Sequence, residues 1–191
     1  MDAKQRIEEL LDQLGHLHRS YHREFAYSNG LNLRQLEALL FLSNCNRYSD
    51  TPLALSEYLG LTKGTVSQTI ISLEDKDLLK KSKDPKDGRI VHLQLTKEAQ
   101  KLVRQCLKGS QRAKALDESS EQLESLEDGL MELLKRIQHT NGYRTFGICQ
   151  TCSHFRPQGL GKQHQCGLTL EPLYSKESLK LCREHTEERE L

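Results

Sequence analysis

Four cysteines near the end of the chain form the residue pattern with the clearest chemistry. The first two are separated by two residues, a spacing that lets one turn present two thiolates to the same ion, and the other two would complete a tetrahedral set. The candidate metal ligands are Cys149, Cys152, Cys166 and Cys182. If one of these thiolates is not a ligand, His185 and then His164 are the nearest substitutes. The pattern predicts a metal-binding tail.

The identity of the metal stays open between two alternatives. Four thiolates suit a structural zinc ion and equally an iron-sulfur cluster. The spacing Cys-x2-Cys-x13-Cys-x15-Cys does not match the ferredoxin runs, so zinc is the simpler prediction. With zinc, the tail would be a structural or partner-docking module, and with a cluster it would be a sensor. A flexible tail with reduced cysteines and a redox-switching dithiol are the remaining alternatives.

The tail differs in composition from the rest of the chain. From Tyr143 onward the helical period of apolar residues fades, which predicts a boundary between residues 1–142 and residues 143–191. A segment of about 45 residues with few large apolar side chains is too small to fold reliably around its own core. Metal binding would supply the missing stability. Because catalytic zinc usually keeps three protein ligands and no general base accompanies the cysteines, we expect no enzyme.

The composition limits what the whole molecule can bind. The chain has 191 residues, 29% of them charged, and a net charge of +1, so any binding to nucleic acid must come from a local basic patch. It has no apolar run of about 18 residues, and its N-terminus is unlike a signal peptide, so we expect a cytoplasmic protein without membrane contact. In that reducing compartment, six cysteines favour metal or redox chemistry over disulfides.

The middle of the chain predicts two short helices joined by a tight turn. Residues 51–60 form the first, and the second begins at Thr62, a good N-cap. Val66, Ile70 and Leu73 share one face of the second helix and are expected to be buried. The opposite face is polar near the N-terminal end, the part that a recognition helix inserts into the major groove. Its residues are Lys63, Gly64, Ser67 and Gln68.

A β-hairpin with a basic tip follows. The returning strand, residues 91–95, alternates apolar and polar side chains, and Asp87-Gly88 is a strong signal for a hairpin tip. Five cations gather on this hairpin, namely Lys80, Lys81, Lys83, Lys86 and Arg89. A basic hairpin directly after a helix-turn-helix favours contact with phosphates and the minor groove.

These motifs together resemble one known family. The order LSEYLGLTKGTVSQTIISLEDKDLL, DPKDGR and LQLTKEA resembles the winged-helix core of MarR-type bacterial transcription regulators, closely over residues 33–105. By resemblance, Arg89 would enter the minor groove and Asp87 would fix the wing. The resemblance and the patterns give the DNA-binding candidates Thr62, Lys63, Gly64, Ser67, Gln68, Lys86 and Arg89. Asp77 and Ala99 stand where the family commonly has glycine, and aspartate tolerates a left-handed backbone fairly well.

Two long amphipathic helices flank this core. Apolar residues recur every three or four positions over residues 2–28 and again over residues 123–137. One winged helix cannot cover both stripes, and in the resembled family such helices intertwine between subunits, so we expect a two-fold homodimer. A dimer places two recognition helices about one DNA turn apart, which predicts a palindromic operator.

Several further residues are expected to be structural. Leu33, Leu36 and Leu40 of the helix capped by Asn32 are expected to be core. Cys45 and Cys106 are read as buried thiols, and the residues His16, His18 and His22 as solvated or packed side chains, since nothing nearby completes a ligand set.

The combined prediction is a mainly α protein. It has a winged helix-turn-helix core with a small β-hairpin wing, long N- and C-terminal dimerisation helices and a small metal-stabilised C-terminal module. The resemblance implies a sequence-specific transcriptional regulator that binds double-stranded DNA. The alternative is a metal- or redox-dependent protein-interaction adaptor that retains a winged helix without operator binding, but the basic wing argues against it. The family often binds small-molecule effectors, and no residue set here identifies one.

Overall fold

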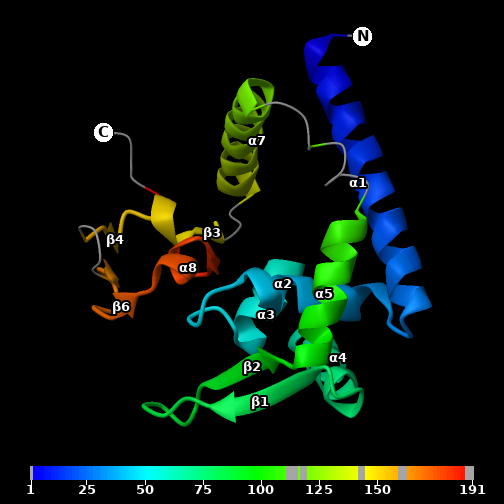
Figure 1. Cartoon of the computed structure of the whole chain (residues 1–191). Helices are drawn as coiled ribbons and strands as arrows, with labels where there is room; N and C mark the ends of the chain where they lie inside the picture. The colour runs from blue at the N-terminus through cyan, green and yellow to red at the C-terminus, as the bar shows by residue number, and fades with distance from the viewer. Residues whose placement is uncertain (1, 111–115, 117–119, 142–144, 159–162, 188–191) are drawn as a thin grey trace.

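The computed structural model describes residues 2–110, 116, 120–141, 145–158 and 163–187. The described chain is mainly helical with three small antiparallel sheets, which confirms the predicted fold class (Figure 1). The first helix, α1 (Ala3–Ser28), begins at a capping box made by Asp2 and Gln5. It ends at Asn29, and Gly30 follows with a φ of 67°, the stop expected from this Asn-Gly pair.

The next three helices build the helix-turn-helix. Helix α2 (Leu33–Asn44) begins at a second capping box, in which Asn32 pairs with Gln35. Helix α3 (Pro52–Leu59) is capped by Thr51 and ends at Gly60, whose left-handed backbone turns the chain sharply. Helix α4 (Lys63–Asp75) then begins at Thr62, whose hydroxyl accepts a hydrogen bond from Thr65 N.

The hairpin predicted from the alternating residues is present. Strands β1 (Leu79–Lys83) and β2 (Val91–Leu95) pair antiparallel, with Lys81 opposite Leu93. Leu93 is buried, whereas Val91 and Leu95 are half-buried. Asp77, at the position where glycine is common, has a φ of 54°, so the structure confirms that aspartate adopts the left-handed turn before the wing.

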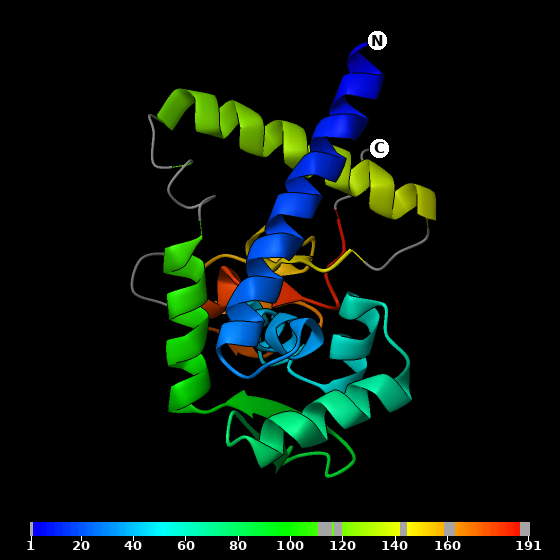
Figure 2. The ribbon, with the colours of Figure 1, turned by 90° about the vertical axis from the view of Figure 1, so that its right-hand side faces the viewer.

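Two further helices follow the hairpin. Helix α5 (Lys97–Gly109) begins at Thr96 and has the strongest amphipathic pattern, burying Ala99, Val103 and Cys106. Helix α7 (Ser120–Asn141) covers the predicted second long stripe. Most of the polar stretch between them lies outside the described residues. Figures 1 and 2 show α4 and the hairpin at one end of the molecule, while the N-terminal half of α1 and α7 lie at the other.

One apolar core holds the helix-turn-helix, the wing and α5 together. Its most deeply buried large side chains come from α2, α3 and α4, and include Leu36, Leu39, Leu55, Val66 and Leu73. The predicted inner face of α4 is confirmed. The prediction for α2 was only partly right. Leu36 is buried as predicted, but Leu33 and Leu40 are half-buried, and Leu39 and Phe41 lie in the core instead.

Two cysteines belong to this core and not to the tail site. Cys45 is 3% exposed and Cys106 is 1% exposed, as predicted for structural thiols. Burial raises the pKa of Cys45 to about 12, so this thiol stays protonated at neutral pH. In α1, His22 is buried and its ring lies 3.9 Å from that of His18, in agreement with packed histidines.

The tail folds into short elements that lie beside the α2–α3 connection. They are β3 (Gly147–Ile148), a 3-10 turn (Cys149–Thr151), β4 (Phe155–Arg156), β5 (His164–Cys166), β6 (Pro172–Leu173), α8 (Ser175–Ser178) and β7 (Leu181–Cys182). Strand β3 pairs with β7, and β5 lies between β4 and β6. At the start of the tail, Phe146 packs edge-on against Phe41 of the core and against the partly exposed ring of Tyr58. The predicted division at residue 142 stays a prediction.

Candidate nucleic-acid interface and thiol site

The N-terminal half of α4 presents a polar, solvent-exposed surface. All five of the contacts predicted here are exposed to solvent. They are Thr62, Lys63, Gly64, Ser67 and Gln68. The opposite face of the same helix is buried in the core, so the helix cannot rotate without exposing it. A rigid helix with a free polar face has the geometry needed to enter a DNA major groove.

The tip of the wing is organised by two carboxylates. Asp84 accepts hydrogen bonds from the backbone N–H groups of Lys86 and Asp87, which fixes the turn. Asp87 accepts both the backbone N–H and the guanidinium of Arg89, with Nε–Oδ1 and Nη2–Oδ2 distances of 3.1 Å. These bonds hold the pKa of Asp87 below its usual range. Asp87 therefore orients an Arg89 side chain that is 91% exposed.

The wing is basic over its whole length. Lys80, Lys81, Lys83, Lys86 and Arg89 are all exposed. Two of them have acidic partners elsewhere in the fold: Lys81 lies 2.6 Å from Glu74 of α4, and Lys86 pairs with Glu171 of the tail. The wing and the exposed face of α4 lie at the same end of the molecule (Figures 1 and 2).

The other end of the molecule carries two exposed apolar stripes. On α1 they comprise Ile7, Leu10, Leu11, Leu14 and Leu17, and on α7 Leu126, Leu130, Met131, Leu134 and Ile137, each at least 36% exposed. Soluble monomers rarely leave so many large apolar side chains in contiguous rows, so these surfaces mark an interface between chains.

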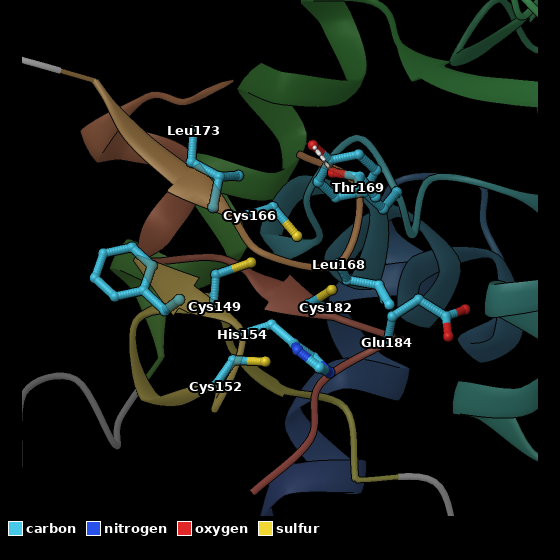
Figure 3. Close-up of a pocket in the computed structure, with 11 residues that line it drawn as sticks. Cys149, Cys152, His154, Cys166, Leu168, Thr169, Leu173, Cys182 and Glu184 are labelled. Carbon is cyan, nitrogen blue, oxygen red and sulfur yellow. Dashed lines mark hydrogen bonds between the residues drawn. The ribbon is translucent and has the colours of Figure 1, made fainter. Parts of the chain in front are cut away.

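The structure brings the four candidate metal ligands of the tail to one small cavity. Cys149 and Cys152 flank the 3-10 turn, Cys166 ends β5 and Cys182 ends β7, and Figure 3 shows their side chains around a common space. The cavity has a volume of about 30 Å³ and all four thiols line it. Segments up to 33 positions apart in the sequence thus bring their cysteines to one cavity.

Two of the four sulfur atoms also accept hydrogen bonds from N–H groups. Asn46 Nδ2 donates to Cys149 Sγ at 3.0 Å, and Thr186 N donates to Cys152 Sγ at 3.4 Å. The hydrogen bond between the Cys149 and Cys182 thiols lowers the pKa of Cys182 and, together with burial, raises the pKa of Cys149, so the pair favours one thiolate, at Cys182. Such donors stabilise thiolates, the form that binds metals.

The thiols are not at ligating positions as they stand. Among the residues that the structure describes, no group of three or more His, Cys, Asp or Glu side chains is placed so that it could hold a metal ion. All six cysteines are free thiols. Binding an ion would require the four sulfur atoms to draw closer together.

The histidine at the cavity is not one of the two substitutes named from the sequence. His154 lines it (Figure 3), whereas His185 Nε2 lies 3.1 Å from Thr151 Oγ1 and the His164 ring packs at a tilt against Phe155. Sequence reasoning also missed Asn46, because it lies 103 residues before its sulfur partner. The position of His154, two residues after the Cys-x2-Cys pair, was an available signal that we did not use.

Comparison with known proteins supports the winged-helix part of the chain. Residues 29–90 match the family model described as MarR family. FabT of Streptococcus pneumoniae, solved in complex with DNA, has 24% identity over 72% of this chain and 99% of its own, with a TM-score of 0.56. MepR of S. aureus in a DNA complex has 21% identity over 69% of this chain and 98% of its own, with a TM-score of 0.54.

An archaeal structure gives the same result. A MarR transcriptional regulator from Methanosarcina mazei Go1 has 21% identity over 72% of this chain and 96% of its own, with a TM-score of 0.54. No curated protein matched the chain. The fold is therefore the winged helix that these MarR-type structures share. In the described part of the chain, no helix is both long enough and apolar enough to cross a membrane.

Proposed function

We propose that this protein is a DNA-binding transcriptional regulator that acts on double-stranded DNA. The observation that carries the proposal is the exposed polar face of α4 beside a basic wing at the same end of the molecule. Lys63, Ser67 and Gln68 would read base edges in the major groove, and Arg89, oriented by Asp87, would enter the minor groove. The match to the MarR family and the similarity to FabT and MepR, both solved with DNA, support this assignment.

The regulator would act as a homodimer. Pairing the apolar stripes of α1 and α7 with those of a second chain would bury surfaces that one chain leaves exposed. Two recognition helices related by a two-fold axis would meet two half-sites about one helical turn apart, so the operator would be a palindrome. Selection from random-sequence duplexes should therefore enrich inverted repeats, and enrichment of a single half-site would contradict the dimer.

A gel-shift titration over a range of salt concentrations tests DNA binding. We expect duplex binding whose affinity falls steeply with salt, because phosphate contacts release counterions. Arg89→Glu should lower the affinity more than tenfold, as one cation at the interface becomes an anion. Lys108→Glu, a similar charge reversal in the exposed last turn of α5 and outside both proposed interfaces, should have little effect. Absence of duplex binding even at low salt would reject the regulator in favour of a protein-interaction adaptor.

For the tail, we propose a structural zinc ion held by Cys149, Cys152, Cys166 and Cys182. The support is the convergence of four thiols from three chain segments on one cavity, together with N–H donors aimed at two of the sulfur atoms. The spacing of the four cysteines does not match the ferredoxin runs, which favours a single zinc ion over an iron-sulfur cluster. Bound zinc would link the turn at Cys149 to β5 and β7.

Elemental analysis with a visible absorption spectrum tests the metal. We expect one zinc per chain, a colourless protein, and loss of the metal in Cys149→Ser. Cys106→Ala, which changes a buried thiol outside the cavity, is the matched control and should retain the zinc. If the protein instead contains iron and has a brown chromophore, the site is an iron-sulfur cluster that acts as a sensor, and the zinc proposal is wrong. Protein purified without any metal and unable to take up zinc would reject both.

A further inference from the structure

One side chain links the wing to the segment that leads into the helix-turn-helix. His92 of β2 lies between two carboxylates: its Nδ1 is 2.6 Å from Asp50 Oδ1, and its Nε2 is 3.1 Å from Asp84 Oδ2. Asp50 immediately precedes Thr51, the residue that caps α3, whereas Asp84 follows β1 at the start of the wing tip. The three side chains are between 18% and 23% exposed, so both contacts are partly shielded from water.

The link continues from Asp84 to the end of the wing. The other carboxylate oxygen of Asp84, Oδ1, accepts hydrogen bonds from the backbone N–H groups of Lys86 and Asp87, at 2.7 and 2.8 Å. The Asp87 carboxylate in turn holds the guanidinium of Arg89. A chain of hydrogen bonds therefore runs from the start of α3, through His92, to the cation proposed to enter the minor groove.

Both contacts of His92 require a proton on each ring nitrogen. A carboxylate can only accept a hydrogen bond, and a neutral imidazole has one N–H group and one lone pair. In the neutral ring, one nitrogen would face a carboxylate oxygen with no hydrogen between them, and the link from Asp50 to Asp84 would be broken on one side. The imidazolium has two N–H groups and satisfies both carboxylates with charge-assisted hydrogen bonds.

The surroundings of His92 favour this second proton. Partial burial works against the charged ring, but the hydrogen bonds to Asp50 and Asp84 outweigh it and raise the pKa of His92. Hydrogen bonds from Asp87 N, His92 and Lys86 N lower the pKa of Asp84, so this carboxylate is ionised at neutral pH. Burial raises the pKa of Asp50, which also favours a proton shared between Asp50 and the ring.

The other ionisable groups near His92 have partners outside this cluster. His92 lines a solvent-filled cleft of about 1170 Å³ between the wing, the α2–α3 connection and the tail. The other ionisable residues of the cleft, which contact one another or Glu57 and Glu177, are Arg47, Tyr48, Lys86, Asp87, Arg89, Glu171, Arg183 and Glu184. Lys180 of the tail acts on Asp50 as a weaker, more distant charge. Titration at the base of the wing near neutral pH therefore belongs to His92 and its two carboxylates.

We propose that His92 is a positioning residue for DNA binding: with both ring nitrogens protonated, it ties the wing tip to the start of α3 and holds Arg89 in place for the minor groove. This inference rests on the DNA-binding function proposed above and deepens it. Loss of one ring proton breaks the chain of hydrogen bonds at its centre, and the wing tip must then be ordered when DNA binds, at a cost in affinity. By linkage, DNA binding takes up a proton, so affinity falls as pH rises.

Duplex affinity measured at constant salt from about pH 5.5 to about pH 8.5 tests the proposal. Wild-type affinity should fall about threefold, because one hydrogen bond is lost. The backbone bond from Leu93 N to Asp50 O, at 2.7 Å, does not depend on that proton, so the wing stays folded. His92→Gln, which is neutral at every pH, should have a flat profile at the weaker, high-pH affinity. A flat wild-type profile, or an unchanged profile in His92→Gln, would overturn the proposal.

The pH midpoint gives a readout that a purely structural role would not move. Asp50→Asn removes one of the two carboxylates that favour the imidazolium, so the midpoint of the wild-type profile should shift to lower pH. Glu98→Gln, which removes an exposed carboxylate in the first turn of α5, is the matched control and should leave the midpoint in place. Equal midpoints in Asp50→Asn and wild-type protein would contradict the assignment to His92.

A double-mutant cycle separates positioning from a direct attraction between the His92 charge and DNA. If His92 acts through Arg89, the Arg89→Ala variant should bind with the same affinity at every pH, with or without His92→Gln. A cation that acts on phosphates by itself would keep its effect without Arg89, and this result would overturn the positioning role. A protein that binds no duplex at any pH refutes the regulator itself, whereas one that binds equally at every pH refutes only the role of His92.

Discussion

The winged helix and the tail are stabilised by different means. In the winged helix, four helices and a hairpin enclose side chains such as Leu36, Leu55 and Leu73, none more than 1% exposed. In the tail, strands of two or three residues carry few large buried side chains, chiefly Leu173, with the thiols of Cys149 and Cys182. Apolar burial specifies the first region, whereas the second is held by hydrogen bonds to the α2–α3 connection and, under the proposed zinc site, by its thiols.

This difference separates the effects that mutations should have. A change in the apolar core should destabilise the winged helix and leave the thiol cavity intact. A change at the thiols should unfold the tail and leave most of the core stable. The predictions below test this separation.

The largest expected effect follows Cys149→Ser. Because structural zinc in small domains contributes on the order of 10 kcal/mol of apparent binding free energy, the tail should lose its fold when the site fails. Hydrogen exchange should show amide protection in β5 and β7 falling by at least about 100-fold, with α2 and α4 little changed. Equal loss of protection in both regions would show that they form one cooperative unit.

A core truncation should have the reverse pattern. Leu73→Ala removes a fully buried side chain of α4 and should lower the free energy of unfolding of the winged helix by about 2–5 kcal/mol. Denaturant titration measures this change, and the zinc content should remain one per chain. Leu14→Ala, on the exposed stripe of α1, is the control: it should spare the core and weaken the dimer instead.

Two substitutions at the DNA-binding end should differ in kind. Arg89→Ala should weaken binding to every operator variant by about tenfold and reduce the salt dependence. Removing a base-reading side chain, as in Gln68→Ala, should instead change the preference among operator sequences, worth about 1–3 kcal/mol at the affected base pair. Competition assays with single-base operator variants distinguish the two, and identical effects on all sequences would show that the recognition face was misassigned.

The smallest expected effect is a pH dependence at the base of the wing. Burial alone would lower the pKa of His92, but hydrogen bonds to Asp50 and Asp84 outweigh it and raise the pKa. The charged imidazole therefore stabilises the wing fully below the unfolded pKa of about 6.5, and this contribution is lost as pH rises through the folded pKa. NMR titration of His92 should give a value above 6.5. In His92→Gln, hydrogen exchange of the wing should lose this pH dependence.

Much of the winged helix was predictable because local signals agreed with tertiary packing. Caps at Asn32 and Thr62 marked where helices begin, and the three-four spacing of Val66, Ile70 and Leu73 identified a buried face. The prediction was less accurate on α2, where residues 38–42 form a continuous apolar run. There Leu39 and Phe41 lie deeper than Leu33, and periodicity alone could not select between the faces.

For the tail, the sequence predicted which cysteines lie near each other but not the other contacts. The Cys-x2-Cys spacing constrains Cys149 and Cys152 to one short turn, whereas their role as metal ligands stays a prediction. Nothing local identified Asn46 or the pairing of Lys86 with Glu171, which joins positions 85 residues apart. Such contacts depend on how the tail packs against the α2–α3 connection and the wing, which local sequence patterns do not specify.

The aromatic side chain of Phe146 has a consequence for how this protein can be shortened. Because it packs against Phe41 and Tyr58, the root of the tail completes the surface of the winged helix. A chain ending before this residue would leave an aromatic pair open to solvent and prone to association. A shortened chain should therefore keep Phe146, because the tail begins within the packing of the winged helix.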